Sequence, residues 1–304
     1  MMSKVDTYLF MSKNVIYVVY VDDCLFWARS QSDIDNVMKT FKEDGLIYNW
    51  EHSKGESVSE FLGIDIRTLD DGGFQFFQTG LIRKVLEATG MDHCNGLPTP
   101  TNVESPLGTD GNGYEAKRDW PISYPSFIGM MLYLESNTRP DISFCVHQCA
   151  RFTHNIKVSH ETAVKRICRY LQGTKDNGLV FNPSNKLVVD CYADAYFAGL
   201  WGHEDPQDTI CAKSRTGFVV TFSNCPLLWV SKLQTDIAFS TLHSEYVALS
   251  HSVRALLPLK SLIKEVIDYL GIDSENLKLV SSSTIYEDNN GDIAVVTSPM
   301  MTPT

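Results

Sequence analysis

The sequence contains no apolar run of about 18 residues, so no membrane-spanning helix is predicted. Its first residues, Met1–Val5, carry no basic stretch that leads into an apolar core, so no secretory signal is predicted either. None of the eight cysteines forms a C-x-x-C pair, which disfavours a zinc site and favours buried free thiols in a reducing compartment. We therefore expect a cytoplasmic or nuclear protein that is neither secreted nor bound to a membrane.

An overall excess of positive charge is also missing. The net charge is −11, which argues against nucleic-acid binding over the whole surface. Between Arg139 and Lys175, however, seven Lys or Arg residues stand against two acids. Three of these cations lie three or four positions apart on a predicted helix and therefore share one surface: Lys165, Arg166 and Arg169. A basic segment inside an acidic protein carries more weight than the net charge of the whole chain.

With 304 residues, 43% of them hydrophobic, the chain can form about two domains with real cores. In its first third, the apolar runs Val15–Val21 and Leu25–Ala28 predict a hairpin with Asp22 and Asp23 at its tip. An amphipathic helix is expected next, ending at Gly45. Two further strands are expected at Glu60–Ile66 and Phe74–Phe77, joined by a turn at Asp70–Gly73. A helix is expected at Leu81–Thr89.

Residues 95–121 contain four prolines and four glycines, which indicates a linker or long loop. Apolar residues at helical spacing then predict three helices, followed by three strands and one long helix that Pro258 kinks or splits. The helices are expected at Phe127–Leu134, Ile142–Phe152 and Ser159–Leu171, the strands at Leu187–Tyr192, Gly217–Phe222 and Leu227–Val230, and the long helix from Thr241. Leu277–Ser281 and Thr284–Tyr286 are candidates for one more strand.

Two groups of acids carry the candidate chemistry. Asp22 and Asp23 stand between two apolar strands, where paired carboxylates favour divalent cations such as Mg²⁺. The alternative interpretation is a hairpin turn with two solvated acids. The second group is spread along the chain: Asp194 follows one strand, Glu245 lies in the first turns of a helix, and Asp288 follows another strand. A folded α/β domain can gather acids placed in this way around metal ions, although each acid alone is typical of a surface.

The sequence motifs around these acids resemble those of the Pol polyproteins of copia-type (Ty1/copia) LTR retrotransposons. Tyr20–Asp23 (YVDD) is similar to the catalytic motif of reverse transcriptases, and Phe61–Ile64 (FLGI) to the strand that follows it. Further motifs similar to those of the copia family occur in the order that the family has: TRPDI at Thr138–Ile142, HETAVKRICRYLQGT at His160–Thr174, YADAYFAG at Tyr192–Gly199, KSRTG at Lys213–Gly217, WVSK at Trp229–Lys232 and STLHSEYVA at Ser240–Ala248. The resemblance extends from about Asp6 to about Val296.

This resemblance implies roles for the acids. Asp22 and Asp23 are similar to metal-binding aspartates of reverse transcriptase, and Asp194, Glu245 and Asp288 to three of the four metal ligands of ribonuclease H. Mg²⁺ or Mn²⁺ is the implied cofactor, and a template–primer or an RNA–DNA hybrid is the implied partner. Within a longer Pol polyprotein, the Lys165–Arg169 helix is expected to face the hybrid backbone, where phosphate contacts position a substrate without specifying its sequence.

The sequence departs from the family pattern in ways that bear on activity. The upstream palm strand that carries the first polymerase aspartate in the family is not in this sequence. Nor is the histidine-rich stretch that brings the fourth ribonuclease H carboxylate, and Asp292 follows Asp288 too closely to replace it. Tyr196, His243 and Pro125 stand where the family usually has Asp, Glu and Arg. We therefore expect no polymerisation, and weak or no ribonuclease H cleavage, from this chain alone.

The expected fold class is α+β in three parts. Residues 1–95 are assigned to a partial reverse transcriptase palm and the start of the thumb, and residues 96–180 to a helical thumb or connection region. Residues 185–304 are assigned to a truncated ribonuclease H-like domain, a mixed sheet with flanking helices. The alternatives are a non-catalytic nucleic-acid-binding remnant and a decayed gene fragment without function.

Overall fold

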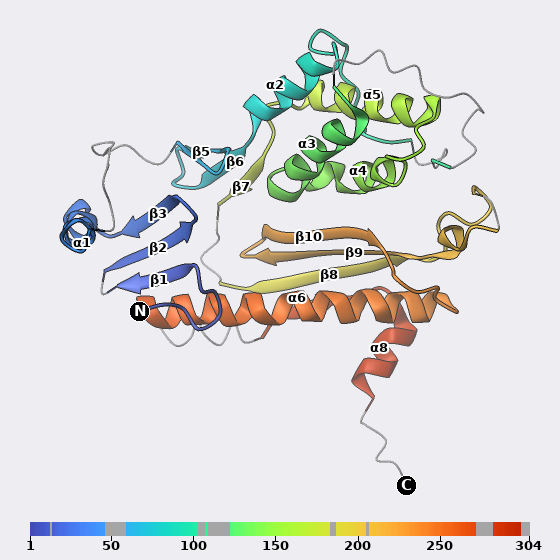
Figure 1. Ribbon diagram of the computed structural model, residues 1–304. Helices are drawn as coiled ribbons and strands as arrows, with labels where there is room; N and C mark the ends of the chain where they lie inside the picture. The colour runs from blue at the N-terminus through green and yellow to red at the C-terminus, as the bar shows by residue number, and fades with distance from the viewer. Residues whose placement is uncertain are drawn as a thin grey trace.

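The computed structural model describes residues 1–12, 14–45, 59–102, 107–108, 122–182, 187–204, 207–271 and 282–298. These residues form three β-sheets and a set of helices in a mixed α+β arrangement (Figure 1). Within the described ranges, no helix is both long enough and apolar enough to cross a membrane. All eight cysteines are free thiols, and six of them are buried.

The first sheet is an antiparallel meander of β1 (Leu9–Ser12), β2 (Val15–Tyr20) and β3 (Asp23–Ala28), with helix α1 (Gln31–Glu43) against it. The pairing of Tyr20 with Asp23 closes a two-residue turn and confirms the predicted hairpin. Stacked aromatic rings hold the sheet to α1: Phe10, Tyr17 and Phe26 line up across the three strands, and Phe41 packs edge-on against Tyr17. The sheet therefore has an ordered core of its own, away from the acids at its turn.

The second sheet consists of four strands: β4 (Glu60–Phe61), β5 (Ile64–Thr68), β6 (Phe74–Phe77) and β7 (Leu179–Phe181). The single strand expected from residue 60 to residue 66 is wrong, because Leu62 and Gly63 both adopt positive φ and turn the chain back on itself. Strand β7 returns from far along the sequence to pair with β6. The second sheet thus joins residues on both sides of the 95–96 boundary.

Four helices share one apolar core next to this sheet: α2 (Thr79–Ala88), α3 (Tyr124–Asn137), α4 (Ser143–Ala150) and α5 (Val158–Gly173). A short 3-10 helix, Pro140–Ile142, leads into α4. The fully buried side chains of the core that the four helices share include Leu134, Val146 and Ile167. The buried guanidinium of Arg139 donates hydrogen bonds to the Asp141 carboxylate in the 3-10 helix and to the carbonyl of Thr174, the C-cap of α5. It therefore holds the end of α5 against the segment between α3 and α4.

The third sheet has the order β10-β9-β8-β11. Strands β8 (Val189–Tyr196), β9 (Arg215–Phe222) and β10 (Cys225–Leu233) are antiparallel, whereas β11 (Thr284–Tyr286) runs parallel to β8. A 3-10 helix, Thr209–Ala212, precedes β9. Helix α6 (Thr241–Leu270) lies along one face of this sheet, and α8 (Asn290–Thr297) contacts the start of α6.

Helix α6 is continuous, so the kink or split expected at Pro258 is wrong. A proline in a helix removes one backbone hydrogen bond and crowds the preceding turn, at a cost of about 3 kcal/mol. Leu256 and Ile267, on either side of Pro258, are both buried in the core that α6 shares with the third sheet. Packing against the sheet on both sides of the proline therefore keeps the two halves in line.

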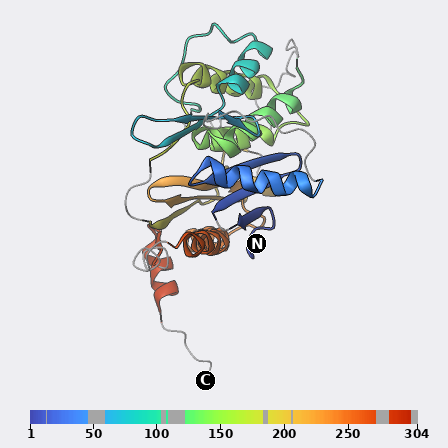
Figure 2. The ribbon, with the colours of Figure 1, turned by 90° about the vertical axis from the view of Figure 1, so that its left-hand side faces the viewer.

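The helices that share the apolar core, α2 to α5, lie on the face of the third sheet opposite α6, as the end-on view of α6 shows (Figure 2). The Trp229 indole on β10 donates a hydrogen bond of 2.9 Å to the Glu135 carbonyl on α3. Beyond the end of α4, Arg151 pairs with the fully buried carboxylate of Glu204 at 2.7 Å. These contacts fix the helices relative to the end of β8, where the candidate site lies.

Candidate metal centre

Strand β8 places Asp194 close to its end. Its alternation buries Val189, Cys191 and Ala193 in the core shared with α6, while Tyr192 and Asp194 take the exposed positions. Period-two alternation of this kind is what a strand with one buried face requires. Asp194 therefore comes from a rigid, paired strand, because β9 and β11 lie on either side of β8.

Glu245 reaches the same place from helix α6. The helix begins at an N-cap, Ser240, whose hydroxyl accepts the His243 amide. Glu245 lies one turn later and is only 8% exposed. Its Oε2 atom has no hydrogen-bond partner among the described residues. A buried carboxylate oxygen without a partner is costly, which favours protonation or a nearby cation, although a hydrogen bond from the Ala195 backbone favours the charged form of the same carboxylate.

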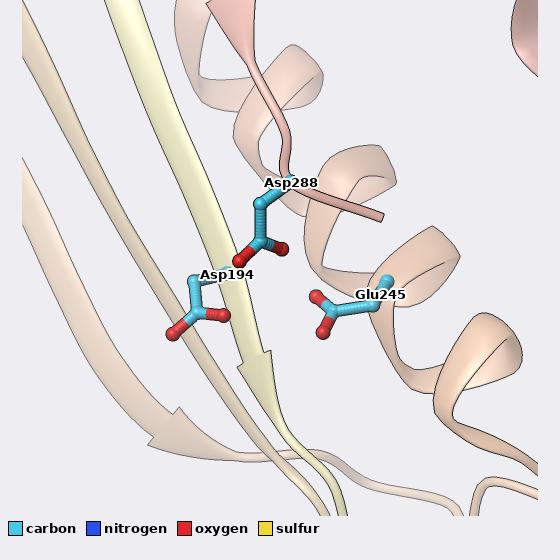
Figure 3. Close-up of side chains that lie close together, drawn as sticks. All are labelled: Asp194, Glu245 and Asp288. Atoms are coloured by element: carbon cyan, nitrogen blue, oxygen red, sulfur yellow. The ribbon is translucent and has the colours of Figure 1, made fainter. Parts of the chain in front are cut away.

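Asp288 follows β11, and the strand register explains its position. Because β11 runs parallel to β8 with Tyr286 opposite Tyr192, Asp288 emerges level with Asp194. The two tyrosine rings stack with their centroids 4.7 Å apart, which fixes this register next to the acids. Figure 3 shows the three carboxylates pointing toward one another from β8, α6 and the segment after β11.

The structure brings Asp194, Glu245 and Asp288 together, with one oxygen of each within 4.8 Å of the others. Burial, together with the nearby carboxylates of Glu287, Asp194 and Asp288, raises the pKa of Glu245 from 4.5 to about 7. Such crowding of like charge around a buried carboxylate is typical of functional acids. The site is therefore electrostatically prepared for a positive ion.

The donor set fits Mg²⁺ or Mn²⁺. All three donors are carboxylate oxygens, which these hard cations prefer. Ligands at about 2.1 Å from one ion lie at most about 4.2 Å apart, so the observed spacing would close by a few tenths of an ångström around one ion. The same three carboxylates would also suit two ions, each held by some of them.

Two further acids, which the sequence did not single out as ligands, lie beside this cluster. Glu287 raises the pKa of Glu245, and burial raises the pKa values of both Glu287 and Asp292. Asp292, in the first turn of α8, is fully buried, and neither of its oxygens has a partner among the described residues. In the sequence, three acids between residues 287 and 292 indicate that this segment could hold further ligands. The sequence does not show which of these acids are buried.

Asp22 and Asp23 are placed differently. Both are exposed at the turn between β2 and β3, beside Val21, which has a positive φ of 54°. Among the described residues, no third acid, histidine or cysteine joins them within metal-ligand distance. The structure thus does not bring the two predicted acid groups into one site.

The three predicted basic residues lie on α5, where Lys165 is exposed and Arg166 and Arg169 are half-buried. Arg166 donates a hydrogen bond of 2.7 Å to the Thr99 hydroxyl. Arg169 donates one of 2.9 Å to the Asn95 carbonyl. Two of the three cations therefore also hold the segment that follows α2 against α5.

Fold and site together define an α+β protein with an acidic centre suited to divalent metal ions. No family model matches the sequence, and no solved structure matches the chain. The retrovirus-related Pol polyprotein from transposon RE1 of Arabidopsis thaliana is 30% identical over 97% of this chain, and that from transposon TNT 1-94 of Nicotiana tabacum is 29% identical over 84%. An uncharacterized mitochondrial protein of Arabidopsis thaliana is 31% identical over 77% of this chain and 89% of its own length.

The chain belongs to the family of retrovirus-related Pol polyproteins from transposons, which confirms the copia-type resemblance drawn from the motifs. It spans about a fifth of the length of the RE1 and TNT 1-94 polyproteins. It thus corresponds to one part of those longer proteins.

Proposed function

We propose that this chain is the reverse transcriptase–ribonuclease H portion of a copia-type Pol polyprotein. Its centre at Asp194, Glu245 and Asp288 is assigned the cleavage of the RNA strand of an RNA–DNA hybrid. The observation that carries the proposal is the convergence of three carboxylates from a strand, a helix and a second strand end on one point. A metal-dependent phosphodiesterase needs acids on rigid elements in this way.

Each acid has a distinct part in this chemistry. Asp194 and Asp288, both exposed at the ends of neighbouring strands, would hold the ions on the side open to the substrate. Glu245, buried behind them, would fix the ions against α6, and their charge would favour its ionised form. When bound, such ions supply an activated water and stabilise the charge that develops on the phosphate.

The Asp22–Asp23 hairpin is proposed to be unable to support polymerisation in this chain alone. Two exposed carboxylates at a turn provide too few ligands to hold a pair of ions in fixed geometry. Primer extension on an RNA template with purified chain should give no product above background. Extension that disappears in Asp22→Asn would contradict this part of the proposal.

The cleavage assay uses a hybrid with a labelled RNA strand, incubated with the full chain and Mg²⁺ or Mn²⁺. We expect weak, metal-dependent cleavage, because the described residues bring three carboxylates together where the family resemblance implies four. Asp194→Asn should lower the rate at least 100-fold. The matched control is Asp236→Asn, an exposed aspartate outside the cluster, which should leave the rate unchanged. Equal loss in both variants, or cleavage that survives chelation, would sink the proposal.

A second candidate is a binding function without catalysis, which the cations of α5 favour. Hybrid binding that weakens with salt, and weakens again in the Lys165→Glu, Arg166→Glu double variant, would indicate contacts to phosphates. Such binding without any cleavage would favour this candidate over the first. Binding that responds to neither salt nor the substitutions would exclude it.

A further inference from the structure

Helix α8 lies against the start of α6 with its polarity reversed. Asp292 is the only charged residue of this helix, and it is also the only residue of the helix that is buried. The apolar side chains point outward instead: Ile293, Val295 and Val296 are 42%, 55% and 56% exposed. A surface helix normally buries its apolar face and leaves its charges in water. Apolar burial therefore does not account for the position of α8.

The carboxylate of Asp292 has no protein partner that would explain its burial. The residue is fully buried, and neither carboxylate oxygen has a hydrogen-bond partner within the described ranges. Removing an unpaired carboxylate from water is costly, because the protein interior replaces neither its hydration nor its counter-charge. A nearby cation would offset this cost.

A capping interaction joins Asp292 to a residue of the metal centre. The side-chain oxygen of Asn289, the N-cap of α8, accepts hydrogen bonds from the amides of Gly291 and Asp292 at 2.9 and 3.2 Å. Asp288 directly precedes this cap. Asp288 and Asp292 therefore stand on one short, hydrogen-bonded segment, and a displacement of α8 would also displace Asp288.

Asp292 acts on the centre by its charge and not as a ligand. It lies outside the set of carboxylates whose oxygens are within 4.8 Å of one another. Burial raises the pKa of Glu287 most, and the charges of Asp292 and Asp288 raise it further, against a hydrogen bond from the Asn289 amide. Asp292 is thus within electrostatic reach of the acids around the centre. Positive charge placed among these acids would turn their mutual repulsion into attraction.

We propose that α8 docks stably against α6 only when the metal centre holds a divalent ion, and that Asp292 couples the two events. In the metal-bound chain, the buried Asp292 carboxylate is offset by positive charge, and α8 keeps Asp288 in place as a ligand. In the metal-free chain, α8 leaves α6 and Asp292 returns to water. This inference rests on the metal centre of the proposed function and adds a regulation to it, because the site is completed only on loading.

Hydrogen–deuterium exchange of the full chain at pH 8, with and without saturating Mn²⁺, tests the docking directly. Exchange reports local opening of a helix even when the rest of the protein stays folded. We expect the amides of residues 290–297 to exchange at least tenfold more slowly with Mn²⁺. The amides of α1, which belongs to the first sheet, should exchange at the same rate in both samples.

Two matched variants identify the coupling residue. Asp292→Asn removes the buried charge, so α8 should exchange slowly with and without Mn²⁺, and the two rates should agree within about twofold. Asp268→Asn, which neutralises an exposed acid on α6, should keep the tenfold difference of the wild type. Equal rates with and without Mn²⁺ in the wild type, or a tenfold difference that persists in Asp292→Asn, would overturn the proposal.

Counting the bound Mn²⁺ in the same samples by electron paramagnetic resonance separates this inference from the proposed function. Binding of Mn²⁺ without slower exchange in α8 would overturn the docking alone. Slower exchange without cleavage of a hybrid would support the docking and contradict the cleavage assignment. Absence of Mn²⁺ binding would contradict both.

Discussion

The two acidic groups of this protein differ in how the chain gathers them. Asp22 and Asp23 are neighbours in sequence, yet they remain an exposed pair on one hairpin. Asp194, Glu245 and Asp288 are far apart in sequence, yet three elements bring their oxygens within 4.8 Å. The adjacent acids on the turn keep their water, whereas Glu245, which joins the second group from a packed helix, is buried. The second arrangement creates a free-energy cost that a cation can relieve.

The pH dependence of stability should show this difference most strongly. Because the folded-state pKa of Glu245 is raised to about 7, its ionisation opposes folding. Its effect is absent below pH 4.5, grows as the pH rises to about 7, and is constant above that. In the metal-free chain the loss should stay below about 3 kcal/mol, because one pKa unit corresponds to about 1.4 kcal/mol and solvent at the exposed Asp194 and Asp288 screens their repulsion. Urea unfolding between pH 4.5 and 8 measures it.

The matched variants sharpen this comparison. Glu245→Gln should reduce the pH dependence and stabilise the metal-free chain at pH 8, and the dependence that remains should come from Glu287 and Asp292, whose pKa values burial also raises. Asp23→Asn, which neutralises an exposed acid, should leave the profile of the wild type unchanged. A profile that is flat in the wild type, or equally altered by both substitutions, would mean that the buried cluster is no more strained than the hairpin.

Backbone strain at the hairpin should give a smaller effect. Val21 is β-branched and has a φ of 54°, a conformation that such residues rarely adopt. Val21→Gly should therefore stabilise the chain by about 1 kcal/mol, because glycine accepts positive φ without a steric cost. The denaturation midpoint is the measurement, and Val19→Gly, within strand β2, is the control that should destabilise instead.

The smallest effect is expected from the hairpin acids themselves. The Asp22→Asn, Asp23→Asn double variant should change the free energy of unfolding by less than about 0.5 kcal/mol, as is usual for exposed positions. Thermal denaturation with and without Mg²⁺ measures this. A metal-dependent stabilisation that the double variant abolishes would show that the hairpin binds an ion and that the comparison drawn above is wrong.

Local patterns predicted much of the fold. The apolar runs on both sides of Asp22 and Asp23 predicted the hairpin. Glu245 lies in the first turns of a helix and Asp288 follows a strand, as predicted, whereas Asp194, expected after a strand that ends at Tyr192, lies within β8. These signals depend only on residues close in sequence, so they can be seen before the chain folds. The metal-binding roles of these acids stay predictions.

Features that depend on distant residues were missed. The pairing of β7 with β6 joins segments about a hundred residues apart, and Leu179–Phe181 alone is too short to predict it. The continuity of α6 through Pro258 depends on packing against the sheet. The burial of Asp292 depends on where α8 meets the start of α6. In each case tertiary contacts override what the local sequence favours.

The most direct test of the central claim is metal binding by matched variants. Mn²⁺ titration of the full chain, followed by electron paramagnetic resonance, counts the bound ions in the wild type, in Asp194→Asn and in the Asp22→Asn, Asp23→Asn double variant. The account predicts saturable binding that Asp194→Asn weakens at least tenfold and the double variant leaves unchanged. Binding that is lost in the double variant and retained in Asp194→Asn would place the metal centre at the hairpin and contradict the account.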